Sequence, residues 1–586
     1  MIQNTSEDYI AVTGSPNTTN TLTFDVLAKA INSPLDGALV EIHTSIAQVT
    51  QVDKIIILGQ IIQAETTNRW HEQPAMAGVI KVRGCIPHIT GISDVTRGTI
   101  SVLGVYKKQQ DGQWIKVTLA VPPGTGIGIK KVTMPTITDL LQTEKRIGEK
   151  HGHYAYIGEF WGTPGVHAPV TVRHFGDYQD GGLGEAWMGG IFGPSGSGKS
   201  VMAAKLISAY AHNPKMGILL VDPQSEFAEN KTHKPGQFDM DFHAMLSSVS
   251  RGRFQPDRDI LRINQICWDS RPLMVEVLRQ KKFFKLIGIS NPKMHEAREP
   301  LEQALDIIAD KLKNGGWKRQ WQDINAKPTE ADLFKNAIIS GMGDSYAAAT
   351  RTEMISRFET NWVSQAAKLE TAWNIAVDFF LPSTNKVNVE TILVAALERG
   401  GIKILDLDPG KVEMSEEFRN FLLDALLTKL RNIANRNYKH RTNPTNCLVV
   451  FDEAHLFAPQ TNEDGSAAGD DLAANLEKTV RTLRKMRTGF LFITQSISKI
   501  RSDIYKQLHY CFYGAGLIAN DLKRLEEKDG AEAKEAYKNL PNPKQSGRYC
   551  FLINGGLVCL GTSSRPMIVE AVGGHPEFLA LNAHLF

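Results

Sequence analysis

The segment Trp187–Ser200, WMGGIFGPSGSGKS, decides the fold of this chain. It starts with a short apolar run, Trp187–Phe192, and continues into a glycine-rich turn with the spacing G-x-x-x-x-G-K-[ST] over Gly193–Ser200. Glycine lets the backbone wrap an anion without side-chain clashes, and a following helix points its N-terminal N–H groups at the same place. A flexible linker is the alternative, but it explains neither the strand before the turn nor the helix after it. The pattern predicts a phosphate-binding loop.

The residues of this loop are expected to share the binding of ATP and its metal ion. Lys199 should reach the β- and γ-phosphates, and Ser200 should ligate Mg²⁺. The predicted nucleotide-binding residues are Gly193, Pro194, Ser195, Gly196, Ser197, Gly198, Lys199, Ser200 and Val201.

A second segment, Cys447–His455, is an apolar strand that ends in two carboxylates, Asp452 and Glu453. The carboxyl ends of parallel strands meet at one edge of a sheet, beside the loop that binds phosphate. We expect Asp452 to hold the Mg²⁺ shell and Glu453 to polarise the attacking water. By itself an Asp-Glu pair is a common exposed strand end, but its place downstream of the glycine turn favours the catalytic interpretation.

Two other strand ends bring polar groups to the same edge. Thr494 and Gln495 follow the apolar run from Gly489, and Gln495 is predicted to lie near the γ-phosphate. For Thr494 a sensor and a simple capped strand end are equally good interpretations. The cluster Asp222–Phe227 either contacts the nucleotide or caps the next helix.

Composition limits the classes of function. Apolar residues make up 42% of the 586 residues and charged residues 22%, which is typical of a soluble globular protein. A net charge of +3, from 66 basic and 63 acidic residues, excludes a polycation. Binding to nucleic acid would therefore depend on local basic patches, such as Arg279–Lys285, Arg431–Arg441 and Arg481–Arg487. Such patches are otherwise solvated surface.

The chain carries no signal for export or for a membrane. Its N-terminus lacks a basic and apolar leader, and its apolar runs are too short to span a bilayer. Six scattered cysteines without a CxxC pair indicate reduced thiols and no zinc site. We predict a cytoplasmic protein.

The pattern of apolar runs and turn residues predicts an α/β fold in several parts. Residues 1–130 read as a small N-terminal β-barrel, 131–185 as a linker, 186–237 and 388–586 as the P-loop core, and 238–387 as a helical insertion. The core should contain a mostly parallel sheet with helices on both faces. The expected barrel strands are Ala38–His43, Lys54–Ala64, Gly78–Cys85, Thr99–Tyr106 and Trp114–Val121. The expected core strands are Trp187–Phe192, Met216–Val221, Gly401–Leu407, Cys447–Phe451, Gly489–Thr494, Tyr510–Gly514, Tyr549–Ile553 and Gly556–Gly561.

The order of these segments resembles the HerA family of hexameric DNA translocases and helicases, which is related to FtsK. The motifs that carry the resemblance are IFGPSGSGKS, LLVDPQSEF, LVVFDEAHLFAP and LRKMRTGFLFITQSISKI, and the likeness spans nearly the whole chain. It implies a RecA-like ATPase core with an N-terminal HAS-type barrel and an inserted helical subdomain. It also implies a homohexamer that moves double-stranded DNA through its pore. The barrel would dock a nuclease or another effector, in DNA end processing or in defence against phage.

The resemblance assigns the usual roles to Lys199, Ser200, Asp452, Glu453 and Gln495. It further suggests that Arg484 is an arginine finger that acts on the adjacent subunit's nucleotide. The family usually has a Gly-Arg-Lys-aromatic-Gly run at this place, whereas this chain has LRKMR over residues 483–487. Arg481 and Arg487 therefore stay open as alternatives, as does a solvated or DNA-facing basic surface. Arg565 is a weaker candidate for a contact with nucleotide.

Two other classes of function compete with a DNA motor. A ring-forming ATPase of regulatory type would assemble and activate an effector enzyme without processive movement along DNA. A P-loop kinase would need a second substrate pocket, for which the sequence gives no signal.

Overall fold

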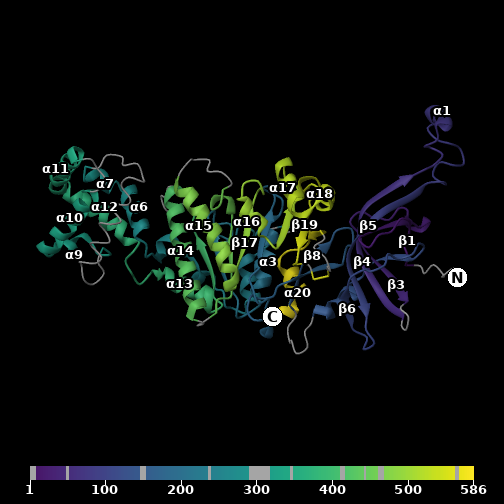
Figure 1. Cartoon of the computed structure of the whole chain (residues 1–586), viewed down its shortest axis with the longest axis horizontal. Helices are drawn as coiled ribbons and strands as arrows, with labels where there is room; N and C mark the ends of the chain where they lie inside the picture. Colours follow the sequence, from purple (N-terminus) through teal and green to yellow (C-terminus); the bar gives the residue numbers. More distant parts are fainter. Residues whose placement is uncertain are drawn as a thin grey trace.

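The structure is a computed structural model that describes residues 8–47, 52–144, 153–234, 236, 239–288, 317–343, 348–408, 416–440, 444–459, 467–557, 559–560 and 566–586. Its parts follow one another along the long axis of the molecule (Figure 1). The N-terminal barrel lies at one end, the large sheet with its helices in the middle, and a helical part at the other end. None of the described helices combines the length and apolar character needed to cross a bilayer.

The N-terminal part is a closed β-barrel, as predicted. Within the described residues, the ring runs β2-β1-β7-β3-β4-β5 and closes because β5 also pairs with β2, with Thr21 opposite Ser101. The side chains of Leu22, Val40 and Ile57 fill its interior. The strands are β1 Ala11–Thr13, β2 Thr21–Val26, β3 Leu39–Ala47, β4 Val52–Thr67, β5 Val95–Lys108, β6 Trp114–Val117 and β7 Gly128–Lys131.

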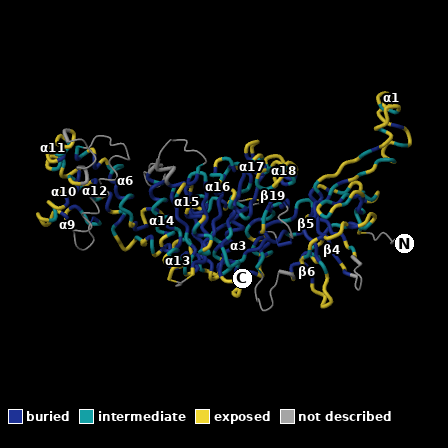
Figure 2. Tube along the Cα trace, viewed as in Figure 1, coloured by how far each residue is buried: buried dark blue, intermediate teal, exposed yellow. Residues whose placement is uncertain are grey.

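The prediction of a strand at Gly78–Cys85 is wrong, because residues 78–83 belong to helix α1, Pro74–Arg83. The helix sits at the tip of the β4–β5 hairpin, which projects from the barrel (Figure 1). Its exposed surface is apparent in Figure 2, and Val82 is 84% exposed. A strand there would leave its backbone N–H and C=O groups without a neighbouring strand, whereas a helix satisfies them internally.

The central part is a mixed sheet with helices on both faces. Among the described strands the order is β12-β15-β11-β16-β17-β10-β18-β19-β20-β8-β9. The strands from β12 to β18 are parallel, and β19, β20, β8 and β9 continue the sheet in antiparallel pairing. Ile218 and Leu220 enter one apolar core while Leu219 and Val221 enter the other, so both faces are buried. The predicted α/β fold with a P-loop core is confirmed.

The strands of this sheet are β8 Tyr154–Phe160, β9 His167–Thr171, β10 Met188–Phe192, β11 Gly217–Asp222, β12 Ile260–Arg262, β15 Ile402–Asp406, β16 Cys447–Phe451, β17 Thr488–Thr494, β18 Tyr510–Gly514, β19 Tyr549–Gly555 and β20 Met567–Ala571. The helices around it include α3 Lys199–Tyr210, α4 Phe242–Val249, α5 Pro256–Asp259, α13 Val389–Glu398, α14 Glu416–His440, α15 Ala467–Leu483, α16 Ser502–Lys506, α17 Ala519–Asp529, α18 Ala531–Lys538, α19 Pro543–Ser546 and α20 His575–Leu581. Gly556 and Leu557, expected in a strand, lie in a turn after β19.

Residues 131–185, which we expected to be a linker, contribute to both neighbouring parts. They begin with the last residue of β7 and helix α2, Met134–Leu140, and then form β8 and β9 at the edge of the central sheet. The pairing of β8 with β20 joins segments about 400 positions apart, with Glu159 opposite Glu570. Local sequence patterns do not report such a pairing.

The helical part lies within residues 271–378, a narrower range than the expected insertion. Before it, α4 packs on α3 and β12 extends the sheet beside β15, so residues 242–262 belong to the core. The helical part has its own aromatic centre, formed by Phe283, Phe334 and Trp373. Its helices are α6 Arg271–Gln280, α7 Phe283–Leu286, α9 Trp321–Asn325, α10 Pro328–Gly343, α11 Ala348–Ser364 and α12 Ala366–Asp378, with short strands β13 Ile266–Cys267 and β14 Val387–Asn388 at its base. Residues 289–316 and 344–347 of the expected insertion lie outside the described residues.

The barrel is bonded directly to the central part. The Tyr106 hydroxyl donates to the carbonyl of Leu560 over 2.7 Å, and the Ser101 hydroxyl donates to Glu532 over 2.6 Å. Glu532 lies on α18, so the barrel contacts both a loop and a helix of the ATPase core.

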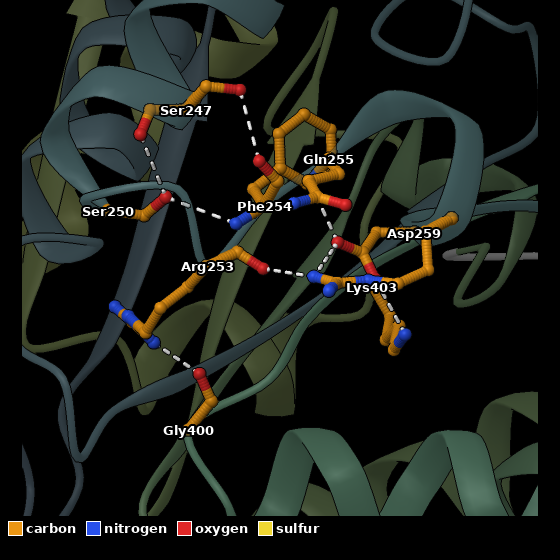
Figure 3. A network of polar contacts seen from close by, with 9 residues as sticks. Ser247, Ser250, Arg253, Phe254, Gln255, Asp259, Gly400 and Lys403 are labelled. Carbon is orange, nitrogen blue, oxygen red and sulfur yellow. Dashed lines mark hydrogen bonds and ion pairs between the residues drawn. The ribbon is translucent and has the colours of Figure 1, made fainter.

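A partly buried arginine, Arg253, contacts the end of the helix that follows the glycine loop, and Figure 3 shows its bond to Gly400. The Arg253 guanidinium donates to the carbonyls of Ala211, Asn213, Met216 and Gly400, the contact to Asn213 measuring 2.9 Å and that to Met216 3.2 Å. The last carbonyls of a helix have no partner within the helix, so one cation here serves the end of α3 and the start of β11. Burial lowers the pKa of Arg253 to about 10.

Candidate functional site

The glycine loop leaves strand β10 at the carboxyl edge of the parallel sheet and runs into α3. Gly196 and Gly198 have φ angles of +82° and +88°, a region that side chains disfavour. A Cβ atom at Gly198 would also lie 2.6 Å from the ring of Tyr549, at the start of β19. The loop therefore needs glycine at position 198 for two reasons, and its backbone stays open to a ligand.

The acidic strand end lies at the same edge as the glycine loop. The register pairs Phe192 with Thr494 and Phe451 with Phe492, so β10, β17 and β16 end almost level. One strand, β17, separates β10 from β16, which puts their ends roughly 10 Å apart. That spacing suits a triphosphate held between the loop and the acids.

Lys199 lies in the electric field of this acidic group. Its Nζ donates to the Pro194 carbonyl of its own loop over 3.1 Å. Burial lowers the pKa of Lys199, although the charges of Glu453, Asp452 and Glu226 act in the opposite direction. An anionic phosphate would stabilise the ammonium further.

Glu453 is held by side chains from the neighbouring strand end. The Gln495 amide donates to Glu453 Oε1 over 2.9 Å, and His455 Nδ1 lies 3.3 Å from Oε2. Burial raises the pKa of Glu453, but the interactions with His455 and Gln495 and the charge of Lys199 outweigh it and leave the pKa below its ordinary value. Glu453 is therefore a fixed carboxylate at neutral pH, the form that accepts a proton.

His455 is a site residue that our sequence analysis did not select. Besides its approach to Glu453, its Nδ1 lies 3.2 Å from the Thr494 hydroxyl. Thr494, Gln495, His455 and Glu453 thus form one polar network across the ends of β16 and β17. The available signal was a histidine two positions after the acid, on the turn that follows a buried strand.

The Asp222–Phe227 cluster shapes its own loop. The Asp222 carboxylate accepts hydrogen bonds from the backbone N–H groups of Gln224, Glu226, Phe227 and Ala228, at 2.8–3.3 Å. The Ser225 hydroxyl donates to Asp406 over 2.6 Å. These bonds fit the capping interpretation of the cluster.

Asp452 is a buried acid whose pKa is raised. It is only 7% exposed. Burial, together with the charges of Asp222 and Glu453, raises the pKa of Asp452 well above its ordinary value. A cation bound beside it would restore the ionised form.

The donors at this edge fit a magnesium ion bound mainly through its nucleotide. The described residues contain no group of three or more His, Cys, Asp or Glu side chains that could hold a metal alone. Mg²⁺ in nucleotide sites usually takes one or two protein oxygens besides phosphate and water. Ser200, at the start of α3, and the buried Asp452 are oxygen donors of this kind.

Replacing Asp452 with asparagine should stabilise the nucleotide-free protein while abolishing ATP hydrolysis. Because the pKa of Asp452 is higher in the folded than in the unfolded chain, the folded state loses stability as the pH rises from the unfolded value toward the folded one. At pH 7 the variant should therefore melt about 2 °C or more above the wild type, and the gap should shrink near pH 4. Thermal melting at both pH values tests this, and a lower melting temperature at pH 7 would contradict it.

Arg484 lies at the amino edge of the parallel strands, and the glycine loop lies at their carboxyl edge. It starts the 3-10 turn η7, Arg484–Met486, just before β17, and its guanidinium donates to Glu185 over 2.9 Å. Its side chain is 40% exposed. Seven residues of β17 separate it from the catalytic edge, roughly 20 Å. Arg484 therefore does not reach the nucleotide of its own subunit.

The alternative arginines share this location but differ in their partners. Arg481 on α15 forms an exposed ion pair with Glu477 over 3.0 Å. Arg487, with a φ of +60°, is bound by both carboxylate oxygens of Asp177. Arg565 lies outside the described residues.

Comparison with known proteins gives one family match. Residues 189–430 match the family model described as the central domain of helicase HerA. This part of the chain is similar to the HerA central domain. The resemblance inferred from the motifs is thereby confirmed for residues 189–430.

Solved structures similar to this chain are distant in sequence. VirB4 of Thermoanaerobacter pseudethanolicus is 13% identical with a TM-score of 0.35, and the match covers 73% of this chain and 98% of VirB4. The bacterial conjugative coupling protein TrwB is 13% identical with a TM-score of 0.37, covering 75% and 91%. The genome packaging NTPase B204 from Sulfolobus turreted icosahedral virus 2 is 16% identical with a TM-score of 0.21, covering 31% and 71%. No curated protein matches the chain.

Proposed function

We propose that this protein is an ATP-driven translocase of double-stranded DNA that works as a homohexamer. The observation that carries the proposal is the fixed carboxylate of Glu453, held by Gln495 at the edge where the glycine loop ends. This is the arrangement required for hydrolysis at a bound triphosphate. The HerA-type domain supports DNA as the substrate.

In the proposed reaction the chain positions ATP and activates water. The loop N–H groups and Lys199 bind the β- and γ-phosphates, and the N-terminus of α3 adds favourable dipole charge. Bound Mg²⁺, next to Ser200 and Asp452, would neutralise charge on the phosphates. Glu453 accepts the proton of the attacking water, and Gln495 and His455 hold the carboxylate in place.

The position of Arg484 supports a ring. Stabilising charge on the transferring phosphoryl group requires a cation near the γ-phosphate. Since Arg484 is too far from its own loop, it would serve the nucleotide of the next subunit in a ring. Hydrolysis would then depend on assembly.

The barrel is proposed as the docking platform for a nuclease or another effector. It stands at the end of the molecule and is bonded to the ATPase core through Ser101 and Tyr106. These bonds offer a direct connection between nucleotide turnover and an effector. DNA end processing and defence against phage, in the cytoplasm, are the two settings that we propose.

Long duplex DNA should stimulate ATP hydrolysis several-fold at low salt, and the stimulation should decline steeply as salt is added. Phosphate contacts release bound counterions, so raising the salt concentration weakens them. The measurement is steady-state phosphate release with and without DNA across a salt series, with native mass determination to establish the oligomer. No stimulation at any salt, or a stable monomer with ATP, would contradict the motor. If Glu453→Gln rings keep effector activity, the regulatory alternative is favoured.

A further inference from the structure

A hollow lies at the amino edge of the parallel sheet, opposite the edge that carries the glycine loop. Its volume is about 620 Å³. It is bounded by the C-terminal end of α14, the approach to β16 and the turn η7 before β17. Its lining includes Asp177, Tyr438, Lys439, Thr445, Lys485 and Arg487.

The lining is positively charged. Arg487 is neutralised by Asp177, the one acid among the described lining residues. Lys439 and Lys485 are exposed, and neither forms an ion pair within the described part of the chain. Two ammonium groups of like charge therefore face one hollow without a counter-charge.

The hollow joins two basic segments that are separate in the sequence. Lys439 belongs to the patch Arg431–Arg441, and Lys485 belongs to Arg481–Arg487. The fold brings them together because α14 and η7 pack against each other. Tyr438, which is 59% exposed, adds an aromatic face and a hydroxyl beside them.

We infer that this hollow binds phosphate groups. Its volume lies in the usual range of ligand sites, about 300–1,000 Å³, and lysine pairs with phosphate as a point charge. The nucleotide of the same subunit is excluded as the source, since β16 and β17 separate the hollow from the catalytic edge by roughly 16 Å or more. The phosphates would come from the DNA backbone, which rests on the proposed function, or from the triphosphate of the adjacent subunit.

The test reverses the two charges in the full-length protein. The variant is Lys439→Glu with Lys485→Glu, and the matched control is Lys54→Glu with Lys544→Glu, two exposed lysines of the barrel and of the segment before β19. Both pairs change the net charge equally. The readouts are the Kd for long duplex DNA over a salt series, and ATPase activity and ATP affinity without DNA. Should the charge-reversed protein fold poorly, Lys439→Gln with Lys485→Gln replaces it.

Two results support the site and identify the source. With DNA as the source, DNA affinity falls about tenfold or more, its salt dependence becomes shallower by about 2 in slope, and activity without DNA matches the control. With the neighbouring triphosphate as the source, activity or ATP affinity without DNA falls and DNA affinity matches the control.

The site is overturned if the variant and the control agree in every readout. Failure of the proposed function is a separate result, in which the wild type neither binds duplex DNA nor responds to it. In that case the phosphate site is supported if only the variant loses ATP affinity. It is overturned if the variant and the control have the same ATP affinity.

Discussion

Replacing Glu453 with glutamine is expected to lower the turnover number for ATP about 10²- to 10⁴-fold while ATP still binds. The amide of glutamine has nearly the same shape but does not accept the proton of the attacking water. The bond from Gln495 shows that the carboxylate is oriented in advance, so its loss is not recovered by rearrangement. Phosphate release and equilibrium binding of ATP give the two quantities.

The control for this variant is Glu226→Gln. Glu226 also acts electrostatically on Lys199, but it lies on the loop shaped by Asp222 and has no contact with Gln495 in the described structure. Its substitution should change the turnover number far less. Equal losses in the two variants would mean that the general negative charge matters and that Glu453 has no special role as the base.

Replacing Arg484 with alanine is expected to reduce ATP turnover in the assembled ring by about 10³- to 10⁵-fold, the usual effect of a missing arginine finger. Binding of ATP should change much less, since Lys199 and the loop remain. The same measurement on Arg481→Ala and Arg487→Ala decides among the three arginines. Loss of the Arg487 pair with Asp177 should lower stability rather than act on turnover alone.

Mixing two inactive variants tests whether the arginine acts between subunits. A Glu453→Gln subunit keeps Arg484, and an Arg484→Ala subunit keeps Glu453. In a mixed ring some interfaces combine the intact groups, so activity should rise above that of either variant alone. If the arginine acted within its own subunit, no combination would restore activity, and the mixture would stay inactive.

The catalytic edge could be predicted from sequence because its signals are local. Each strand there is an apolar run that ends at a polar residue, as at Asp452 and Gln495, and the glycine spacing at 193–198 marks the loop that follows the neighbouring strand β10. Parallel strands then bring these ends together by topology alone.

Other elements depend on partners that are distant in the chain. β8 joins the sheet through β20, and the barrel closes through β2 and β5. Strands of three or four residues, such as β1 and β7, give almost no periodic signal. Helix α1 shows the reverse error, since its β-branched residues suggested a strand, whereas none of the described strands pairs with this segment.

Within the site, the sequence did not distinguish residues placed to bind a ligand from residues that shape the loops. Asp222 and Asp452 both lie at the ends of buried strands, yet Asp222 accepts hydrogen bonds from four backbone N–H groups of its own loop, whereas burial raises the pKa of Asp452 well above its ordinary value. His455 was overlooked because histidine follows many strands, and only the distances to Glu453 and Thr494 reveal its role in the network.

The barrel and the helical part are attached at opposite ends of one continuous sheet, with β10 and its loop between them. The barrel contacts the side of β20 and α18, and the helical part contacts α14 on the other side. These contacts do not involve β10 or β16, the strands that lead to the glycine loop and to Glu453. The architecture is thus modular, because the barrel or the helical part can change in sequence without altering the glycine loop or the acidic strand end.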